Sequence, residues 1–431
     1  MPGRIAFISP TGSGNLGDAA IIDSLIQGVR RRIPDAEIVG FTQNPYDTTA
    51  RHEVRAYTCT GVSMPKYKMT ESAPPDDEDG DDDEPRPSAL SAARGALSLV
   101  PGLRPAYRLV RLTLAERRHR RLSAERIRGF DFVVVAGGGQ LDDFWGGAFG
   151  HPYALMRWAD LARSAGARYV ILSVGTGSLA SRLSALFVRR ALAMADYRSF
   201  RDGRSRDLVG DPELTRDDPI VPDLAYSVPL APEAERPPAA RSIVGVSPMA
   251  YADPRVWPVR DLARYRRHVE TMATLTVRLA RAGHEVVLFT SDSPDRRSLA
   301  EVRGIVDAQL RPDERTRIRV PVIDGVVGLM QVLAGVDIVV AARLHGVLLG
   351  HVAGRPALAV SHERKVRTLM DEMGHGRYCF EIDDFDPEAG WTRLGEIDAR
   401  RPELAAEIGR TVADYRRRVD AQYDRVFGAA R

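Results

Sequence analysis

The residues best placed to do chemistry lie in the segment Asp337-Ile-Val-Val-Ala-Ala-Arg-Leu-His-Gly346. An expected buried strand over Asp337–Ala341 delivers Arg343 and His345 to the start of an apolar helix. A guanidinium, an imidazole and the free backbone N–H groups of a helix amino terminus then meet at one point. That combination suits a ligand that carries a phosphate or a carboxylate.

Two further basic groups follow expected strands and are candidates for the same site. The first is Arg201, in the segment Tyr197-Arg-Ser-Phe-Arg-Asp202, and the second is Lys365, in Ser361-His-Glu-Arg-Lys365. Ordinary surface clusters are the alternative interpretation of both segments. A site that binds a multiply charged anion needs more than one fixed cation.

A glycine-rich turn, Thr11-Gly-Ser-Gly-Asn-Leu-Gly-Asp18, lies between the first expected strand and the first expected helix. Its G-x-G-x-x-G spacing is typical of dinucleotide sites, but Phe41-Thr-Gln-Asn44 supplies no acidic residue to hold a ribose. We interpret the turn as polar, presenting Asn15, Gly17 and Asp18 to a cleft. A simple helix-capping role for Asp18 is the alternative.

Two more glycine turns follow expected strands in the same half of the chain. One is Gly137-Gly-Gly-Gln-Leu-Asp-Asp143, and the other is Gly175-Thr-Gly177. Ligands of open α/β sheets bind at the carboxyl ends of strands, where glycines let the backbone approach closely. The turns therefore predict one wall of a site, with candidates Gly138, Gln140, Asp142 and Gly177. The alternative is that they are tight turns only.

Short runs of β-branched residues alternate with amphipathic stretches, which predicts an α/β fold with parallel sheets covered on both faces. Strands are expected at Arg4–Ser9, Glu37–Thr42, Phe132–Ala136, Tyr169–Val174, Ile243–Ser247, Glu285–Thr290, Arg317–Val320, Asp337–Ala341 and Ala357–Val360. The pattern restarts after a Pro/Ala-rich linker, 229–241. We predict two Rossmann-like domains facing each other across a cleft, in a GT-B-like arrangement: residues 1–230 and 241–400, with a helix in 401–431 packing across their boundary.

Composition narrows the classes of function. The 431 residues carry a formal net charge of +3, which gives no bulk argument for nucleic acid as a partner. Cys59 and Cys379 lack metal-ligand spacing, so we expect neither a disulfide framework nor a metal site. The amino terminus does not resemble a signal peptide, and no apolar run is long enough to span a bilayer. We therefore expect a cytoplasmic protein.

Two charged segments stand apart from this pattern. Residues 72–88 hold the run Asp76-Asp-Glu-Asp-Gly-Asp-Asp-Asp-Glu84 between prolines, and we expect this insertion to be disordered. Residues 103–128 form a basic amphipathic stretch. A solvated helix face is one interpretation of it, and contact with an anionic surface at the inner face of the cell membrane, or with a lipid-linked acceptor, is another.

Taken in order, the motifs resemble those of the polysaccharide pyruvyl transferases through nearly the whole chain. The family's N-x-G-D turn is similar to Asn15–Asp18, and its strand into a triple glycine and an acidic residue is similar to Val133–Asp142. Its R-D-x-x-S, V-P-D, R-x-H-G and K-V elements are similar to the segments that begin at Arg201, Val221, Arg343 and Lys365. Two positions depart from the family pattern, Ala19 and His362.

The resemblance implies transfer of pyruvate from phosphoenolpyruvate to two hydroxyls of a polysaccharide or lipid-linked sugar, giving a cyclic ketal and phosphate. It implies Arg343, Arg201 and Lys365 as clamps for phosphoenolpyruvate beside Leu344. His345 would be an acid or phosphate donor, and Asp18 a base near the acceptor hydroxyl. The first domain would take the acceptor and the second phosphoenolpyruvate, with no cofactor. We keep two alternatives: a nucleotide-sugar glycosyltransferase of the same fold, for which Glu363 and Asp371 have the spacing of an E-x7-E pair, and a non-catalytic glycan-binding protein.

Overall fold

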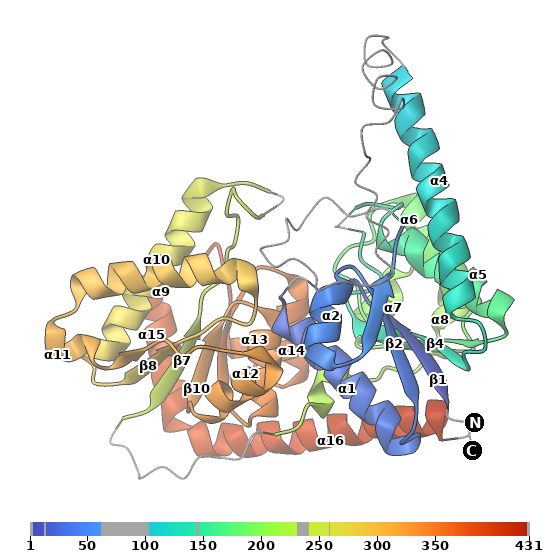
Figure 1. Ribbon diagram of the computed structural model, residues 1–431. Coiled ribbons are helices and arrows are strands. Elements are labelled where there is room, and N and C mark those ends of the chain that lie inside the picture. Colours follow the sequence, from blue (N-terminus) through green and yellow to red (C-terminus); the bar gives the residue numbers. More distant parts are fainter. Residues whose placement is uncertain are drawn as a thin grey trace.

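The computed structural model describes residues 3–12, 14–61, 103–143, 146–230, 241–257 and 259–428, with side chains from residue 113 onward in the helix that starts at 103. The acidic insertion at 72–88 and most of the linker lie outside the described residues. The disorder that we expect of the insertion therefore stays a prediction. Figure 1 shows two α/β units joined along one long carboxy-terminal helix.

The first unit is built on a six-stranded parallel sheet in the order β3-β2-β1-β4-β5-β6. Its strands are β1 (Arg4–Ile8), β2 (Glu37–Thr42), β3 (Arg55–Thr58), β4 (Phe132–Gly138), β5 (Arg168–Val174) and β6 (Tyr197–Phe200). β4 is buried from end to end, and β5 is buried after its first residue, because helices cover both faces of the sheet. The helices are α1 (Leu16–Arg32), α2 (Pro45–His52), α4 (Leu103–Arg126), α5 (His151–Ala165), α6 (Arg182–Ala193), α7 (Gly203–Leu208), α8 (Pro212–Thr215) and the 3-10 helix η1 (Leu224–Ser227).

The second unit repeats the plan with a parallel sheet in the order β12-β11-β10-β7-β8-β9. Its strands are β7 (Ile243–Ser247), β8 (Glu285–Leu288), β9 (Ile318–Arg319), β10 (Ile338–Ala341), β11 (Ala357–Ser361) and β12 (Cys379–Glu381). Its helices are α9 (Leu262–Arg281), η2 (Ser293–Asp295), α10 (Arg296–Gln309), α11 (Pro312–Arg315), α12 (Gly325–Ala334), α13 (Leu344–Val352), α14 (Arg364–Glu372), η3 (Gly376–Tyr378) and α15 (Pro387–Ala399). The predicted fold class, two Rossmann-like units with parallel sheets, is confirmed.

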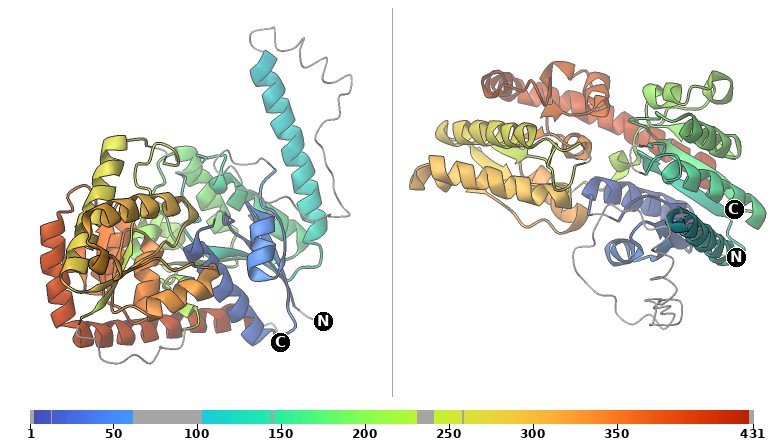
Figure 2. Two further views of the ribbon diagram at one scale, coloured as in Figure 1. Left: turned by 60° about the vertical axis from the view of Figure 1, so that its left-hand side comes forward. Right: turned by 90° about the horizontal axis from the view of Figure 1, so that it is seen from above.

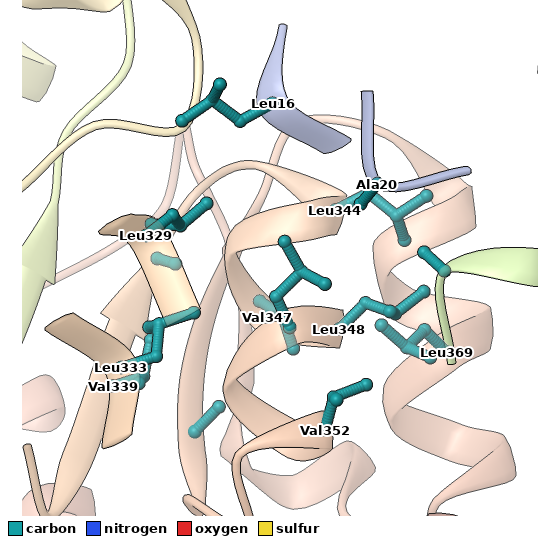
Figure 3. Packing of buried hydrophobic residues seen from close by; sticks show 14 of the residues in the cluster. Leu16, Ala20, Leu329, Leu333, Val339, Leu344, Val347, Leu348, Val352 and Leu369 are labelled. Carbon is teal, nitrogen blue, oxygen red and sulfur yellow. The ribbon is translucent and has the colours of Figure 1, made fainter. Parts of the chain in front are cut away.

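One hydrophobic cluster runs through both units and fixes α1 against α13. Ala20 of α1 lies beside Leu344 at the start of α13, as Figure 3 shows, and Leu16 and Val347 belong to the same cluster. All nine residues of α13 are buried, so its position depends on contacts on every side. The amino termini of these two helices, which carry the N-x-G-D and R-x-H-G motifs, are therefore held together by a shared hydrophobic core.

The last helix, α16 (Arg401–Phe427), runs under both units (Figures 1 and 2). Near its start Arg401 donates to Ser242 beside the second sheet at 2.6 Å. Near its end Gln422 bonds Ser173 and Ser199 of the first sheet, and Phe427 packs edge-on against Phe132. Because one rigid helix is anchored in both sheets, it limits how far the units can separate.

Candidate functional site

A cavity of about 310 Å³ lies where the two units and α16 meet. Three cations line it, one from each part of the fold: Arg201 after β6, Lys365 in α14 and Arg418 in α16. The other polar lining residues include Asp202, Asp223, Tyr226 and Glu372, and the apolar wall includes Ile220, Leu344, Leu348 and Leu369. The cavity therefore offers a small ligand a charged side and an apolar side.

Arg201 is held deep in the cavity wall, with its side chain only 8% exposed. Its Nε donates to Asp202 at 3.2 Å, and one terminal nitrogen lies 3.6 Å from Asp223. Gly175 packs against this guanidinium, since a Cβ there would lie 2.2 Å from Nε. The third glycine turn thus makes room for the arginine that follows the neighbouring strand.

Lys365 reaches the cavity from the first turn of α14. Its Nζ lies 2.7 Å from one carboxylate oxygen of Glu363, and the other oxygen of Glu363 lies 2.6 Å from Nε2 of His362. The nearby charge of Lys365 and the bond from His362 overcome the opposing effect of burial and lower the pKa of Glu363. The carboxylate is thus ionised and fixes the ammonium in place.

Asp223 was not among our sequence-predicted site residues, although the V-P-D motif contains it. Its Oδ1 caps η1 by accepting from the N–H of Ala225 at 3.0 Å. Its Oδ2 is buried without a hydrogen-bond partner among the described residues, 3.6 Å from Arg201 and 3.9 Å from Nε2 of His345. This carboxylate oxygen therefore lies on the cavity wall between the Arg201 guanidinium and the imidazole of His345.

His345 points from the start of α13 toward α1. A Cβ at Gly17 would lie 2.0 Å from its ring, so glycine in the N-x-G-D turn is required by the imidazole of the other unit. His345 is not among the residues that line the cavity, and its Nε2 lies 3.9 Å from Oδ2 of Asp223, which does line it. Nε2 has no hydrogen bond among the described residues, and neither does the buried hydroxyl of Tyr226 on the cavity wall. Burial lowers the pKa of His345, while the charges of Asp223 and Asp18 act in the opposite direction.

Asp18 lies next to Gly17 in the first turn of α1. Burial raises the pKa of its carboxyl, and the positive charges of His345 and Lys365 oppose the rise. A carboxyl with a raised pKa exchanges protons more readily near neutral pH, which fits an acid or base. The turn itself is held by Asn15, whose side chain accepts from the N–H groups of Gly17 and Asp18.

Arg343 does not line the cavity, in contrast to Leu344 beside it. Its Nε and one terminal nitrogen each donate to Asp295 at 2.8 Å, and that terminal nitrogen lies 3.3 Å from Asp292. Asp295 is fully buried. Because Asp295 accepts two hydrogen bonds from it and Asp292 lies close by, the guanidinium joins α13 to the loop after β8. A direct clamp on a ligand would require it to leave these partners.

The predicted acceptor wall divides into two groups. Asp142 accepts from the N–H of Gly177 at 3.2 Å, and Gly177 faces Glu363, since a Cβ there would lie 3.6 Å from its carboxylate. These residues therefore adjoin the cleft. The side chain of Gln140 is buried and bonds His151 and Ser9 inside the first unit. Gly138 has a φ of +69°, packs against Ile21 of α1, and shapes the turn.

Asn15 is also used in the contact between the units. Asn15 and Asp292 form an isolated antiparallel bridge, and the N–H of Leu16 donates to the carbonyl of Ser291 at 2.8 Å. The glycine turn of the first unit therefore contacts the loop after β8, which also supplies Asp292 and Asp295 to Arg343. This backbone contact could not be found from spacing, because it joins segments that lie about 280 residues apart.

The described part of the chain contains neither a metal site nor a membrane-spanning helix. No group of three or more His, Cys, Asp or Glu side chains within the described ranges could hold a metal ion. No described helix is long and apolar enough to cross a membrane.

Comparison with solved structures shows the fold. The UDP-GlcNAc 2-epimerase from Neisseria meningitidis, bound to UDP-GlcNAc, superposes with a TM-score of 0.52 at 9% identity, covering 96% of this chain and 99% of that one. The Anabaena protein HepE in complex with UDP gives 0.54 at 10% identity and 99% coverage of both chains. MnaA from S. aureus with UDP gives 0.53 at 8%, covering 95% of this chain and 91% of that one. At these identities the likeness shows the GT-B-like fold alone.

Comparison with sequences shows the family. A search of curated proteins gives no significant match. The family model described as polysaccharide pyruvyl transferase matches residues 15–364, from the N-x-G-D turn to the start of α14. The match spans most of the chain and covers parts of both units, including the cavity residues Arg201, Asp223 and Leu344 but not those from Lys365 onward. The chain therefore belongs to the polysaccharide pyruvyl transferase family.

Proposed function

We propose that the protein transfers pyruvate from phosphoenolpyruvate to two hydroxyls of a polysaccharide or lipid-linked sugar, forming a ketal and releasing phosphate. The observation that carries this proposal is the cavity with three cations, an apolar wall and unsatisfied buried polar atoms. Phosphoenolpyruvate is a small anion with a carboxylate, a phosphate and an apolar methylene carbon. Each part of the molecule has a counterpart in the cavity.

In this proposal Arg201 and Lys365 bind the anionic groups, and Leu344 lies beside the methylene carbon. Arg418 is a third cation that the sequence did not suggest. Its guanidinium is held by the carbonyl of Ile220 at 2.6 Å and lines the same cavity. Arg343 contributes by holding α13 in position.

Three acidic side chains also line the cavity, and in this proposal one of them, Glu372, takes up a proton when the ligand binds. Partial burial and the charge of Asp202 raise the pKa of Glu372, at the exposed end of the cavity, to about 7. With all groups ionised, three acidic side chains balance the three cations. A proton on Glu372 leaves the cavity positive, so the arrival of a trianion favours proton uptake there.

His345 and Asp223 handle protons in this proposal. The imidazole is kept neutral by burial in the absence of ligand, and the charge of bound phosphoenolpyruvate favours its protonated form. An imidazolium can then protonate the leaving phosphate while Asp223 stabilises its charge. Asp18 gives a proton to the methylene carbon, which becomes the methyl group of the ketal, and then takes one from the attacking sugar hydroxyl, which enters from the side of Asp142 and Gly177. The second hydroxyl displaces the phosphate as the ketal closes and returns its proton to His345.

Product analysis tests the reaction. Phosphoenolpyruvate labelled in the pyruvyl carbons is incubated with the protein and with candidate lipid-linked or free glycans. The proposal expects label in an acid-labile ketal and one phosphate released per ketal formed. A new glycosidic bond formed from a nucleotide sugar would support the glycosyltransferase instead. Glu363 is the first residue of the E-x7-E-like pair that suggested a glycosyltransferase. In the structure its carboxylate contacts His362 and Lys365.

A glycan-binding protein without activity is the remaining alternative. It would bind the acceptor and leave phosphoenolpyruvate unbound and unconverted. The three cations around the cavity argue against it, because they suit a small anion and a neutral sugar has no need of them.

A further inference from the structure

Helices α4, α5 and α6 form a layer over the face of the first sheet that is packed by the second hydrophobic cluster. Residues such as Trp158 of α5 and Val188 of α6 fill the inner side of this layer. Figures 1 and 2 show the amino-terminal half of α4 standing away from the rest of the protein. The outer side of the layer carries two exposed features, one apolar and one basic.

The first feature, here the aromatic patch, lies at the starts of α5 and α6 and consists of Phe149, Tyr153, Leu183, Leu186 and Phe187. Phe149 is 74% exposed, and its ring lies 6.1 Å from Tyr153 and 5.9 Å from Phe187. Leu186 is 58% exposed. Single exposed apolar residues are ordinary, but a cluster of them indicates a contact surface.

The second feature, here the arginine stripe, is Arg117, Arg118, Arg120 and Arg121 on α4. Glu116 and His119 face α5, where each contacts Arg157, at 2.6 and 3.1 Å. At 100° per residue, Arg117, Arg118 and Arg121 then lie on the opposite half of the helix, together with Leu114, which is 59% exposed. Arg120 lies nearer the side of Glu116, and Arg121 also pairs with Glu125 at 3.0 Å. All four arginines are exposed.

The aromatic patch lies beside the acceptor side of the cleft. Phe149 follows the turn that contains Asp142, and α6 follows the turn that contains Gly177. Both turns lie at the carboxyl ends of neighbouring strands, and Gly177 faces Glu363 of the other unit. A surface that binds the patch therefore lies near the entrance through which we expect the acceptor to arrive.

We propose that the aromatic patch and the arginine stripe together form a docking surface for an anionic lipid bilayer. Arginines attract acidic headgroups, and aromatic and aliphatic side chains enter the interface, so the two features supply the two signals that stable peripheral binding requires. Resting on the proposed function, this surface assigns the acceptor to the lipid-linked glycans. A water-soluble polymer would need neither feature.

The test is sedimentation of the full-length protein with vesicles of phosphatidylcholine, with and without phosphatidylglycerol. We expect binding to the vesicles that contain phosphatidylglycerol. Arg117→Gln/Arg120→Gln weakens that binding about 30-fold, because each arginine near an anionic surface contributes about fivefold. Added salt removes most of this difference. Phe149→Ser/Leu186→Ser weakens binding by at least about tenfold at any salt concentration.

Matched controls lie elsewhere on the surface. Arg266→Gln/Arg267→Gln changes two neighbouring exposed arginines on α9, and Val322→Ser/Val327→Ser changes two exposed apolar residues. Both should leave vesicle binding unchanged. Absence of binding by the unmodified protein, or equal binding by all variants, overturns the proposal. Vesicle binding is measured without phosphoenolpyruvate, so it is independent of the proposed reaction. Vesicle binding without ketal formation would support the docking surface and contradict the reaction. Ketal formation without vesicle binding would support the reaction and contradict the docking surface.

Discussion

Replacing Asp223 with Asn removes one negative charge from the cavity wall and leaves its shape almost unchanged. The amide oxygen of Asn can keep the cap of η1, which uses only Oδ1 at 3.0 Å from the N–H of Ala225. What is lost is the charge on Oδ2, which lies 3.9 Å from Nε2 of His345. We expect a folded protein whose turnover is impaired in a pH-dependent way.

The size of the effect follows from that distance. Two unit charges 3.9 Å apart interact by about 1 kcal/mol in water and about 4 kcal/mol at an effective dielectric constant of about 20. Burial already lowers the pKa of His345, and the charge of Asp223 opposes that shift. Without Asp223 the pKa falls further, so the imidazolium is lost at lower pH as the pH rises. At neutral pH we expect turnover to fall at least about tenfold.

The assay is phosphate release at saturating phosphoenolpyruvate and acceptor, measured as a function of pH. The descending limb of the variant's profile should move to lower pH, and the rates of variant and unmodified protein should converge in acid. Asp211→Asn is the matched control, since Asp211 also caps a helix through its side chain but lies outside the cavity. An equal loss at every pH, or no loss, would refute the pairing of Asp223 with His345.

Three further substitutions test neighbouring parts of the site. Gly17→Ala places a Cβ 2.0 Å from the imidazole that it faces, so turnover should fall about 100-fold, while Gly304→Ala, whose Cβ meets nothing within 4 Å, leaves turnover unchanged. Arg343→Ala leaves the buried carboxylate of Asp295 without its partner and should lower the free energy of unfolding, measured with denaturant, by about 3–5 kcal/mol. Adding Asp295→Asn should recover part of that loss. Unchanged stability with weakened phosphoenolpyruvate binding would show that Arg343 binds the ligand directly. Burial raises the pKa of Asp292 to about 7 from 3.8, so its stabilising contribution is full in acid and lost as the pH rises through 7. Asp292→Asn should therefore melt higher than the unmodified protein above about pH 7, and a difference that persists in acid would contradict this assignment.

Much of the fold could be predicted because buried parallel strands are continuous apolar runs. β4 and β10 were recognisable from Phe132-Val-Val-Val-Ala136 and Ile338-Val-Val-Ala341. β3 and β12 were missed because they are short edge strands. β3 is Arg-Ala-Tyr-Thr and has no fully buried residue, and β12 has three residues. Their pairing is decided by the neighbouring strand and leaves little trace in sequence.

The site was predictable as far as strand ends determine it. Arg201, Leu344 and Lys365 line one cavity because each follows a strand whose carboxyl end faces the cleft. The capture of Arg343 by Asp292 and Asp295 could not be predicted, since these acids come from the loop after another strand. Residue type alone likewise cannot show that Gln140 turns inward to His151.

The central claim is that the cavity binds phosphoenolpyruvate, and calorimetric titration tests it most directly. The account predicts one site per chain for phosphoenolpyruvate, weakened about 10- to 100-fold by Arg201→Gln, since one charged hydrogen bond contributes about 1.5–3 kcal/mol. UDP and UDP-sugars should give no heat of binding. Tight binding of a UDP-sugar with none of phosphoenolpyruvate, or an Arg201→Gln variant that binds phosphoenolpyruvate as the unmodified protein does, would contradict it.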